Sequence, residues 1–226
     1  MNLLQILSLL LFVAISITHL VFVFLEKEKG RMITKGLIVF SLMIFALVSK
    51  IKDPLIYLGL IFSLCGDMLL LLKSKKIFFV LGACCFSLTH LMNFIITSRY
   101  LPDRLNWMYF VLVILVGYLL IEFVRPFIKK TMKKMSYPSL AYLYFVLALI
   151  INITIVFITT HNPYFLVMMI GGICFLTSDI ILTIYRFAKK FKKGNFILMI
   201  FYILGQSLIY IPLMMILTKQ NSNIQK

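Results

Sequence analysis

The chain alternates between long apolar stretches and short charged segments over its whole length. Each apolar stretch has the length of about 20 residues that a helix needs to cross a hydrocarbon core about 30 Å thick. The apolar residues are continuous rather than alternating with polar ones, which favours helices over barrel strands. Because every backbone amide in lipid needs an internal partner, helices satisfy such segments best. The pattern predicts transmembrane helices at roughly 3–25, 33–50, 54–72, 77–98, 105–124, 138–160, 163–186 and 195–218.

These spans predict an all-α fold, a polytopic membrane bundle of about eight transmembrane helices that forms a single domain over residues 1–226. The composition agrees, because 62% of the residues are hydrophobic, 13% are charged and the mean hydropathy is +1.06. Soluble domains are roughly half apolar, so the composition excludes a soluble globular domain. Five prolines are expected at or just beyond span ends, where a missing backbone donor costs little: Pro54, Pro102, Pro126, Pro138 and Pro163.

The basic residues are unevenly divided among the connections. The net charge is +16, from 23 Lys and Arg against 7 Asp and Glu, and seventeen of the cations lie in or beside the first, third, fifth and seventh connections. Since basic residues accumulate on the cytoplasmic side, we predict a multi-pass protein of the cell membrane with its odd-numbered loops in the cytoplasm and both termini outside. Cations placed beside headgroups favour membrane lipids as partners, and we expect no nucleic-acid partner.

Two aspartates lie inside the predicted spans, and each follows a small residue. Asp67 is in the third span and Asp179 is in the seventh. A carboxyl group at membrane depth costs several kcal/mol unless a partner or a function retains it. Asp67 stands six residues before Lys73, and Asp179 stands seven before Arg186. Both carboxyls are therefore expected about 9 to 10 Å inside the cytoplasmic edge.

Two carboxyl groups at one depth indicate acid–base chemistry. In a low-dielectric pocket they cannot easily both ionise, which leaves an acid beside a base, as in hydrolytic dyads. Structural hydrogen bonding between helices and proton-coupled transport remain open as alternatives. An intramembrane aspartyl protease is a further alternative, because Gly66 and Asp67 match half of the Gly-x-Gly-Asp signature of such enzymes. Leu64 stands where the first glycine of that signature belongs.

Other polar side chains recur at helical spacing on two spans, and each stripe is expected to face protein. The members are Ser87, His90, Asn93 and Thr97 on the fourth span and Tyr202, Gln206 and Tyr210 on the eighth. His90 is expected about two turns deeper in the membrane than the aspartates. The three histidines have no metal-ligand spacing, so we expect no metal and no cofactor.

Four short motifs around these polar residues follow one another along the chain. They are Phe62–Leu70, Leu81–His90, Gly172–Asp179 and Tyr202–Ile209. In this order and spacing, within an eight-span setting, they resemble the YhhN family of lysoplasmalogenases over nearly the whole chain. That family often opens its second span with Lys-Pro, whereas this chain has Lys35 followed by Gly36.

The resemblance implies an enzyme that hydrolyses the vinyl ether bond of a lysoplasmalogen, which is a lysophospholipid. The products would be a fatty aldehyde and glycerophosphoethanolamine or glycerophosphocholine. Vinyl ethers cleave by proton delivery to the β carbon and water attack on the resulting oxocarbenium ion, which requires one protonated and one ionised carboxyl. Asp67 and Asp179 would be the catalytic residues. The expected substrate-binding residues are Lys35, Lys73, His90, Arg186, Tyr202 and Gln206.

Overall fold

The computed structural model describes residues 2–72, 76–102, 107–132 and 136–224. Within these ranges the regular elements are all helices, as the continuous hydrophobic stretches predict. In chain order they are α1 (Leu3–Phe24), α2 (Glu28–Val48), α3 (Pro54–Leu71), α4 (Lys76–Ser98), α5 (Trp107–Met132), α6 (Ser136–Thr160), α7 (Pro163–Thr183), the π-helical turn η2 (Ile184–Ala188) and α8 (Gly194–Ile224).

Eight of these helices are long and apolar enough to span a membrane, which confirms the predicted all-α class and number of spans. The largest difference is in α5, which was expected to end at 124 and continues through Pro126 to Met132. The continuation places Ile128 in a buried cluster with Phe79, Ile121 and Leu140. We attribute the longer helix to this packing, because burying another large apolar side chain offsets the hydrogen bond lost at the proline.

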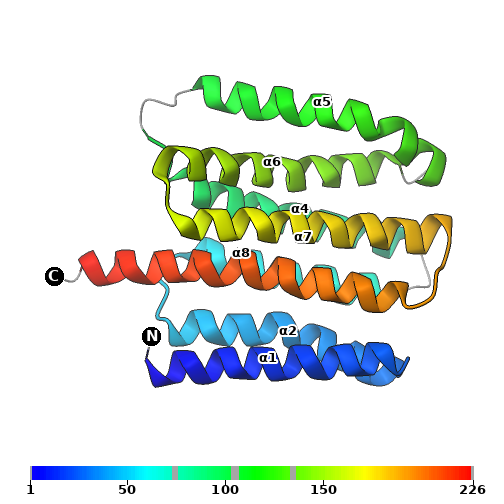
Figure 1. Ribbon diagram of the computed structural model, residues 1–226, viewed down its shortest axis with the longest axis horizontal. Coiled ribbons are helices and arrows are strands. Elements are labelled where there is room, and N and C mark those ends of the chain that lie inside the picture. Colours follow the sequence, from blue (N-terminus) through cyan, green and yellow to red (C-terminus); the bar gives the residue numbers. More distant parts are fainter. Residues whose placement is uncertain (1, 73–75, 103–106, 133–135, 225–226) are drawn as a thin grey trace.

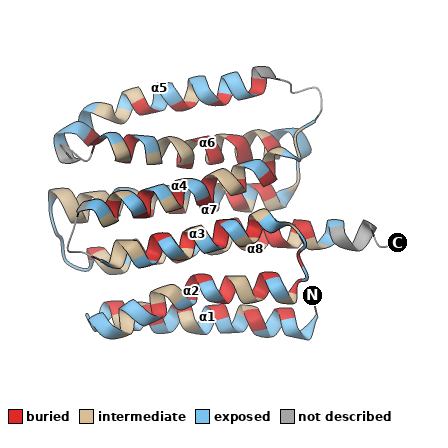
Figure 2. Ribbon diagram, turned by 180° about the vertical axis from the view of Figure 1, so that it is seen from behind, coloured by how far each residue is buried: buried red, intermediate tan, exposed pale blue. Residues whose placement is uncertain are grey.

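The helices lie side by side in an elongated bundle (Figure 1). Helices α1 and α2 form one edge, α5 forms the other, and α3, α4, α7 and α8 occupy the middle. Burial decreases from the middle of the bundle to its edge. In the hydrophobic stretch of α8, 56% of the residues are buried, but only 17% in that of α5 (Figure 2). The start of α1 and the end of α8 lie at the same end of the bundle, and the connections after α1 and α7 lie at the opposite end.

Helices α7 and α8 approach each other very closely because each presents a glycine to the other. A Cβ added to Gly171 would lie 2.8 Å from the backbone carbon of Leu208, and one added to Gly205 would lie 2.9 Å from the Cα of Phe175. Small residues permit such close helix contacts in membranes. The contact fixes the C-terminal half of α7, which carries Asp179, against the N-terminal half of α8, which carries Tyr202.

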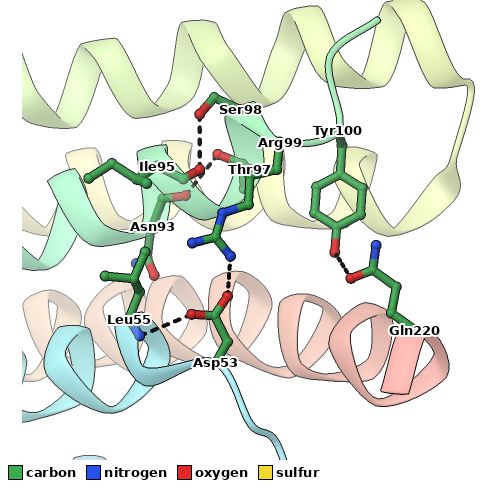
Figure 3. Close-up of polar contacts among 9 residues, drawn as sticks. All are labelled: Asp53, Leu55, Asn93, Ile95, Thr97, Ser98, Arg99, Tyr100 and Gln220. Carbon is green, nitrogen blue, oxygen red and sulfur yellow. Dashed lines mark hydrogen bonds and ion pairs between the residues drawn. The ribbon is translucent and has the colours of Figure 1, made fainter. Parts of the chain in front are cut away.

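At the end of the bundle where α3 begins, polar side chains join α3, α4 and α8 (Figure 3). Asp53 caps α3 by accepting a hydrogen bond from the backbone N–H of Leu55 at 3.1 Å, and it also accepts one from Arg99, which follows α4. Tyr100 donates to Gln220 of α8 at 2.8 Å. Burial, together with the nearby Asp53 carboxylate, raises the pKa of Tyr100 to about 12, so its hydroxyl stays protonated and able to donate.

We expect Asp53→Ala to lower the stability of the protein by about 1–2 kcal/mol, because it removes the helix cap together with the ion pair. Arg99→Gln keeps the helix cap and removes only the ion pair of a half-exposed arginine, so it should lower the stability by about 0.5 kcal/mol or less. Thermal unfolding of both variants in one detergent measures the difference. An equal loss of stability in the two variants would contradict the assignment of the larger effect to the cap.

Candidate active site

Asp67 lies near the C-terminal end of α3 and is fully buried, with no exposed surface. The preceding Gly66 lets the helix pack tightly, since a Cβ there would lie 2.8 Å from the Phe86 ring. The Nζ of Lys35 on α2 lies 3.1 Å from Asp67 Oδ1, and the hydroxyl of Tyr202 on α8 donates to Oδ2. Three helices therefore converge on this one carboxyl group.

Lys35 forms an ion pair within the protein that no sequence pattern indicates. Helix α2 begins at Glu28 rather than at 33, so Lys35 lies about two turns into the helix rather than at its start. Its ammonium lies 5.5 Å from the centre of the Tyr202 ring as well as beside Asp67. Since only 12% of the side chain is exposed, the charge of Lys35 is directed at Asp67.

Asp179 has a different environment from Asp67. It lies on α7, and its Oδ2 accepts a hydrogen bond from the hydroxyl of Tyr142 on α6. Among the described residues no cation pairs with Asp179, and no hydrogen bond joins it to Asp67. Each carboxyl group thus has its own partners, while both line the same cavity.

This polar cavity has a volume of about 370 Å³ and lies at the end of the bundle where α7 meets α8. It brings together four cations, two carboxyl groups and several neutral polar and apolar side chains. The charged members are Arg31, Lys35, Arg186, Lys190, Asp67 and Asp179. Tyr202, Ser178, Tyr185 and Asn195 are among the neutral ones.

A second, almost wholly apolar cavity of about 250 Å³ adjoins the first. Four residues line both cavities: Leu70, Phe86, Asp179 and Leu182. Its wall on α5 includes Phe123 and Phe127, whose side chains are 85% and 54% exposed on the surface that would face lipid. Asp179 therefore stands at the junction of a basic polar compartment and an apolar compartment that borders the bilayer.

Arg186, which the sequence predicts as a substrate-binding residue, lines the polar cavity, and its position is held by aromatic rings. Its guanidinium lies 5.1 Å from the centre of the Phe79 ring and 6.0 Å from that of Phe187. Such cation–π contacts orient a guanidinium without neutralising it. Because Phe79 lines the apolar cavity, Arg186 lies close to the boundary between the two compartments.

Two residues expected at the site do not line either cavity. His90 is 2% exposed and packs edge-on against Phe175, with the ring centres 4.8 Å apart. Gln206 donates from Nε2 to Ser63 Oγ at 3.0 Å, one turn beyond Tyr202. The structure therefore places His90 and Gln206 away from the two cavities, and their role in substrate binding stays a prediction.

One predicted site residue is not described, and some residues of the cavities have no signal in the sequence. Lys73 lies outside the described residues. The sequence gives no signal for three further residues of the cavities: Tyr142, Arg31 and Lys190. One of eleven tyrosines has no distinguishing pattern, and the two cations lie where topology alone places basic residues. In the described ranges no group of three His, Cys, Asp or Glu side chains is arranged to hold a metal.

The fold and the cavities define a multi-pass membrane protein with two carboxyl groups, one fully buried and one partly buried, that line an amphiphilic pocket. The sequence profile of the YhhN family matches residues 30–213, and the chain belongs to this family. The matched range contains every residue that lines the polar cavity. Searches of curated proteins and of solved structures find no match.

Proposed function

We propose that the protein hydrolyses the vinyl ether bond of lysoplasmalogen, releasing a fatty aldehyde and a glycerophosphodiester such as glycerophosphoethanolamine or glycerophosphocholine. Membership of the YhhN family is consistent with a membrane hydrolase. The observation that carries the proposal is the position of Asp179 on the shared wall of a basic polar cavity and an apolar cavity, with Asp67 on the same polar wall.

The two compartments match the two parts of a single-chain lipid. A lysolipid has a phosphate-bearing head, which suits the cations of the polar cavity, and one hydrocarbon tail, which suits the apolar cavity. The vinyl ether is the first bond of the tail beyond the glycerol. In a lipid that occupies both compartments, this bond therefore lies beside Asp179.

The partners of the two carboxyl groups support different roles. The Lys35 ammonium stabilises the anion of Asp67, so we assign Asp67 as the base. Asp179 has no cation paired with it among the described residues and borders the apolar cavity. The apolar surroundings favour the uncharged carboxylic acid, although the hydrogen bond from Tyr142 favours the anion, so we assign Asp179 as the acid.

In the proposed reaction, Asp179 delivers its proton to the β carbon of the vinyl ether, and the double bond becomes an oxocarbenium ion. A water molecule attacks the α carbon while Asp67 accepts a proton from that water. The resulting hemiacetal breaks its bond to the glycerol oxygen and yields an aldehyde and an alcohol. One water is consumed, and transfer of a proton from Asp67 back to Asp179 through solvent restores the starting state.

A panel of three lipids tests the proposed function. Purified protein is incubated with lysolipids that share one headgroup and chain length but carry a vinyl ether, a saturated ether or an ester, and trapped aldehyde is quantified by mass spectrometry. We expect aldehyde from the vinyl ether alone and no cleavage of the other two. Equal cleavage of the ester, or an intact vinyl ether, would contradict the proposal.

We expect Ala83→Phe to reduce turnover of a long-chain vinyl ether by about tenfold or more, because the added ring occupies the apolar cavity that Ala83 lines. A substrate with a short tail needs less of that cavity and should be affected much less. The control is Ala14→Phe, which makes the same change at an exposed position on α1 outside both cavities. A loss that is equal for both tail lengths would contradict the role of the apolar cavity.

A further inference from the structure

The charges on the wall of the polar cavity are strongly biased towards cations. Arg31, Lys35, Arg186 and Lys190 face two carboxyl groups, and Lys35 already pairs with Asp67 at 3.1 Å. In the described part of the chain no ion pair neutralises Arg186 or Lys190. Positive charge therefore remains for a ligand after the internal pairing is complete.

Arg186 and Lys190 lie where a lipid headgroup would emerge from the cavity. Both belong to the segment between α7 and α8, beyond Asp179 in the direction of the membrane surface. Arg186 is held against Phe79 and Phe187 by ring contacts that leave its N–H groups available. Lys190 is exposed. We call the part of the cavity wall formed by Tyr185, Arg186 and Lys190 the rim.

An ammonium-bearing headgroup has little to bind at this rim. Choline and ethanolamine are recognised by carboxylates or by aromatic cages. The carboxyl groups of the cavity are Asp67 and Asp179, which lie deeper and are engaged by Lys35, Tyr202 and Tyr142. Tyr185, an aromatic residue of the rim, packs edge-on against Phe191, with the ring centres 5.9 Å apart.

We propose that the site selects lysolipids whose headgroup carries a net negative charge, such as phosphoglycerol or a terminal phosphate, over those with ethanolamine or choline. This selectivity rests on the proposed function, because it concerns the head of the same substrate. The phosphate binds Arg186 and Lys190 in both classes of lipid. In the zwitterionic class the rim cations also repel the headgroup ammonium. The anionic lipids carry no ammonium, so this repulsion is absent.

Binding of uncleavable saturated ether lysolipids tests the selectivity independently of catalysis. Dissociation constants are measured in a neutral detergent for phosphoglycerol, phosphate, phosphoethanolamine and phosphocholine heads on one tail. We expect the two anionic lipids to bind about tenfold more tightly than the two zwitterionic ones. Each of the two rim cations contributes roughly fivefold in affinity, and salt screening reduces the combined effect. The ratio should fall in high salt. Equal affinities would overturn the proposal whether or not the protein cleaves vinyl ethers.

Matched variants locate the effect. Arg186→Gln and Lys190→Gln should each lower the anionic-to-zwitterionic ratio about threefold. Lys192→Gln removes the same charge from the same connection, at a residue that does not line the cavity, and should leave the ratio unchanged. An equal effect of Lys192→Gln would overturn the assignment to the rim in favour of a general surface potential. Glycerol 3-phosphate serves as a tail-free probe, and binding of this probe as tight as that of the lipids would overturn a lipid-headgroup site.

Discussion

Replacing Asp179 by asparagine is expected to lower the rate of aldehyde release by at least about a thousandfold, and replacing Asp67 by asparagine is expected to lower it by about a hundredfold. The order follows from the chemistry of vinyl ethers. Proton transfer to carbon creates the high-energy oxocarbenium ion, and the other carboxyl group of the described cavity walls, Asp67, is paired with Lys35 and assigned as the base. Water attacks the ion readily once it has formed, so loss of the base is less severe.

The measurement is kcat for aldehyde release from one vinyl ether lysolipid. Asparagine retains the side-chain shape and can still accept the hydrogen bonds from Tyr142 and Tyr202, so both variants should fold. Their unfolding temperatures provide the control. A larger loss in Asp67→Asn would exchange the two roles, and full activity in either variant would remove that residue from the mechanism.

Lys35→Met is expected to have the largest effect on stability, a loss of about 3 kcal/mol, because it leaves the fully buried Asp67 carboxyl without its cationic partner. The double variant Lys35→Met/Asp67→Asn removes both charges and should regain most of that stability. Its aldehyde release should stay about as low as that of Asp67→Asn, because the base is absent. Aldehyde release by Lys35→Met should also be strongly reduced, because an unpaired Asp67 takes up a proton.

The unfolding free energies of the original protein, the two single variants and the double variant form a thermodynamic cycle that measures the coupling. We expect a coupling of about 2 kcal/mol or more between Lys35 and Asp67. Additive losses would show that the two residues do not depend on each other, and the assignment of Asp67 as a lysine-stabilised base would fail.

The architecture was predictable from the sequence because a bilayer imposes a simple rule on the chain. Each span needs about 20 apolar residues, and the eight stretches that satisfy this rule match the eight helices of membrane-spanning length among the described residues. The ends were less predictable where packing decides them. Pro126 reads as a helix end in the sequence, but the burial of Ile128 favours continuation of α5 past it.

The two aspartates were also identifiable from the sequence, because an acidic residue in a span is rare and costly. Their partners were not. Lys35 reads as one more cytoplasmic cation, and only the packing of α2 against α3 reveals that its ammonium reaches Asp67. Tyr142 lies 37 residues from Asp179 in the chain, and no local pattern connects them. The apolar cavity depends on how α5, α6 and α7 are placed, which hydropathy does not encode.

Cleavage in heavy water tests the central claim most directly. Purified protein is incubated with a vinyl ether lysolipid in D₂O, and the aldehyde is reduced at once to a stable alcohol for mass spectrometry. The proposed mechanism places a solvent-derived proton on the β carbon, so the alcohol should carry one deuterium on the carbon next to the former aldehyde carbon, and release should collapse in Asp179→Asn. Aldehyde that lacks this deuterium, or undiminished release from Asp179→Asn, would contradict cleavage by carboxylic acid protonation of the vinyl ether.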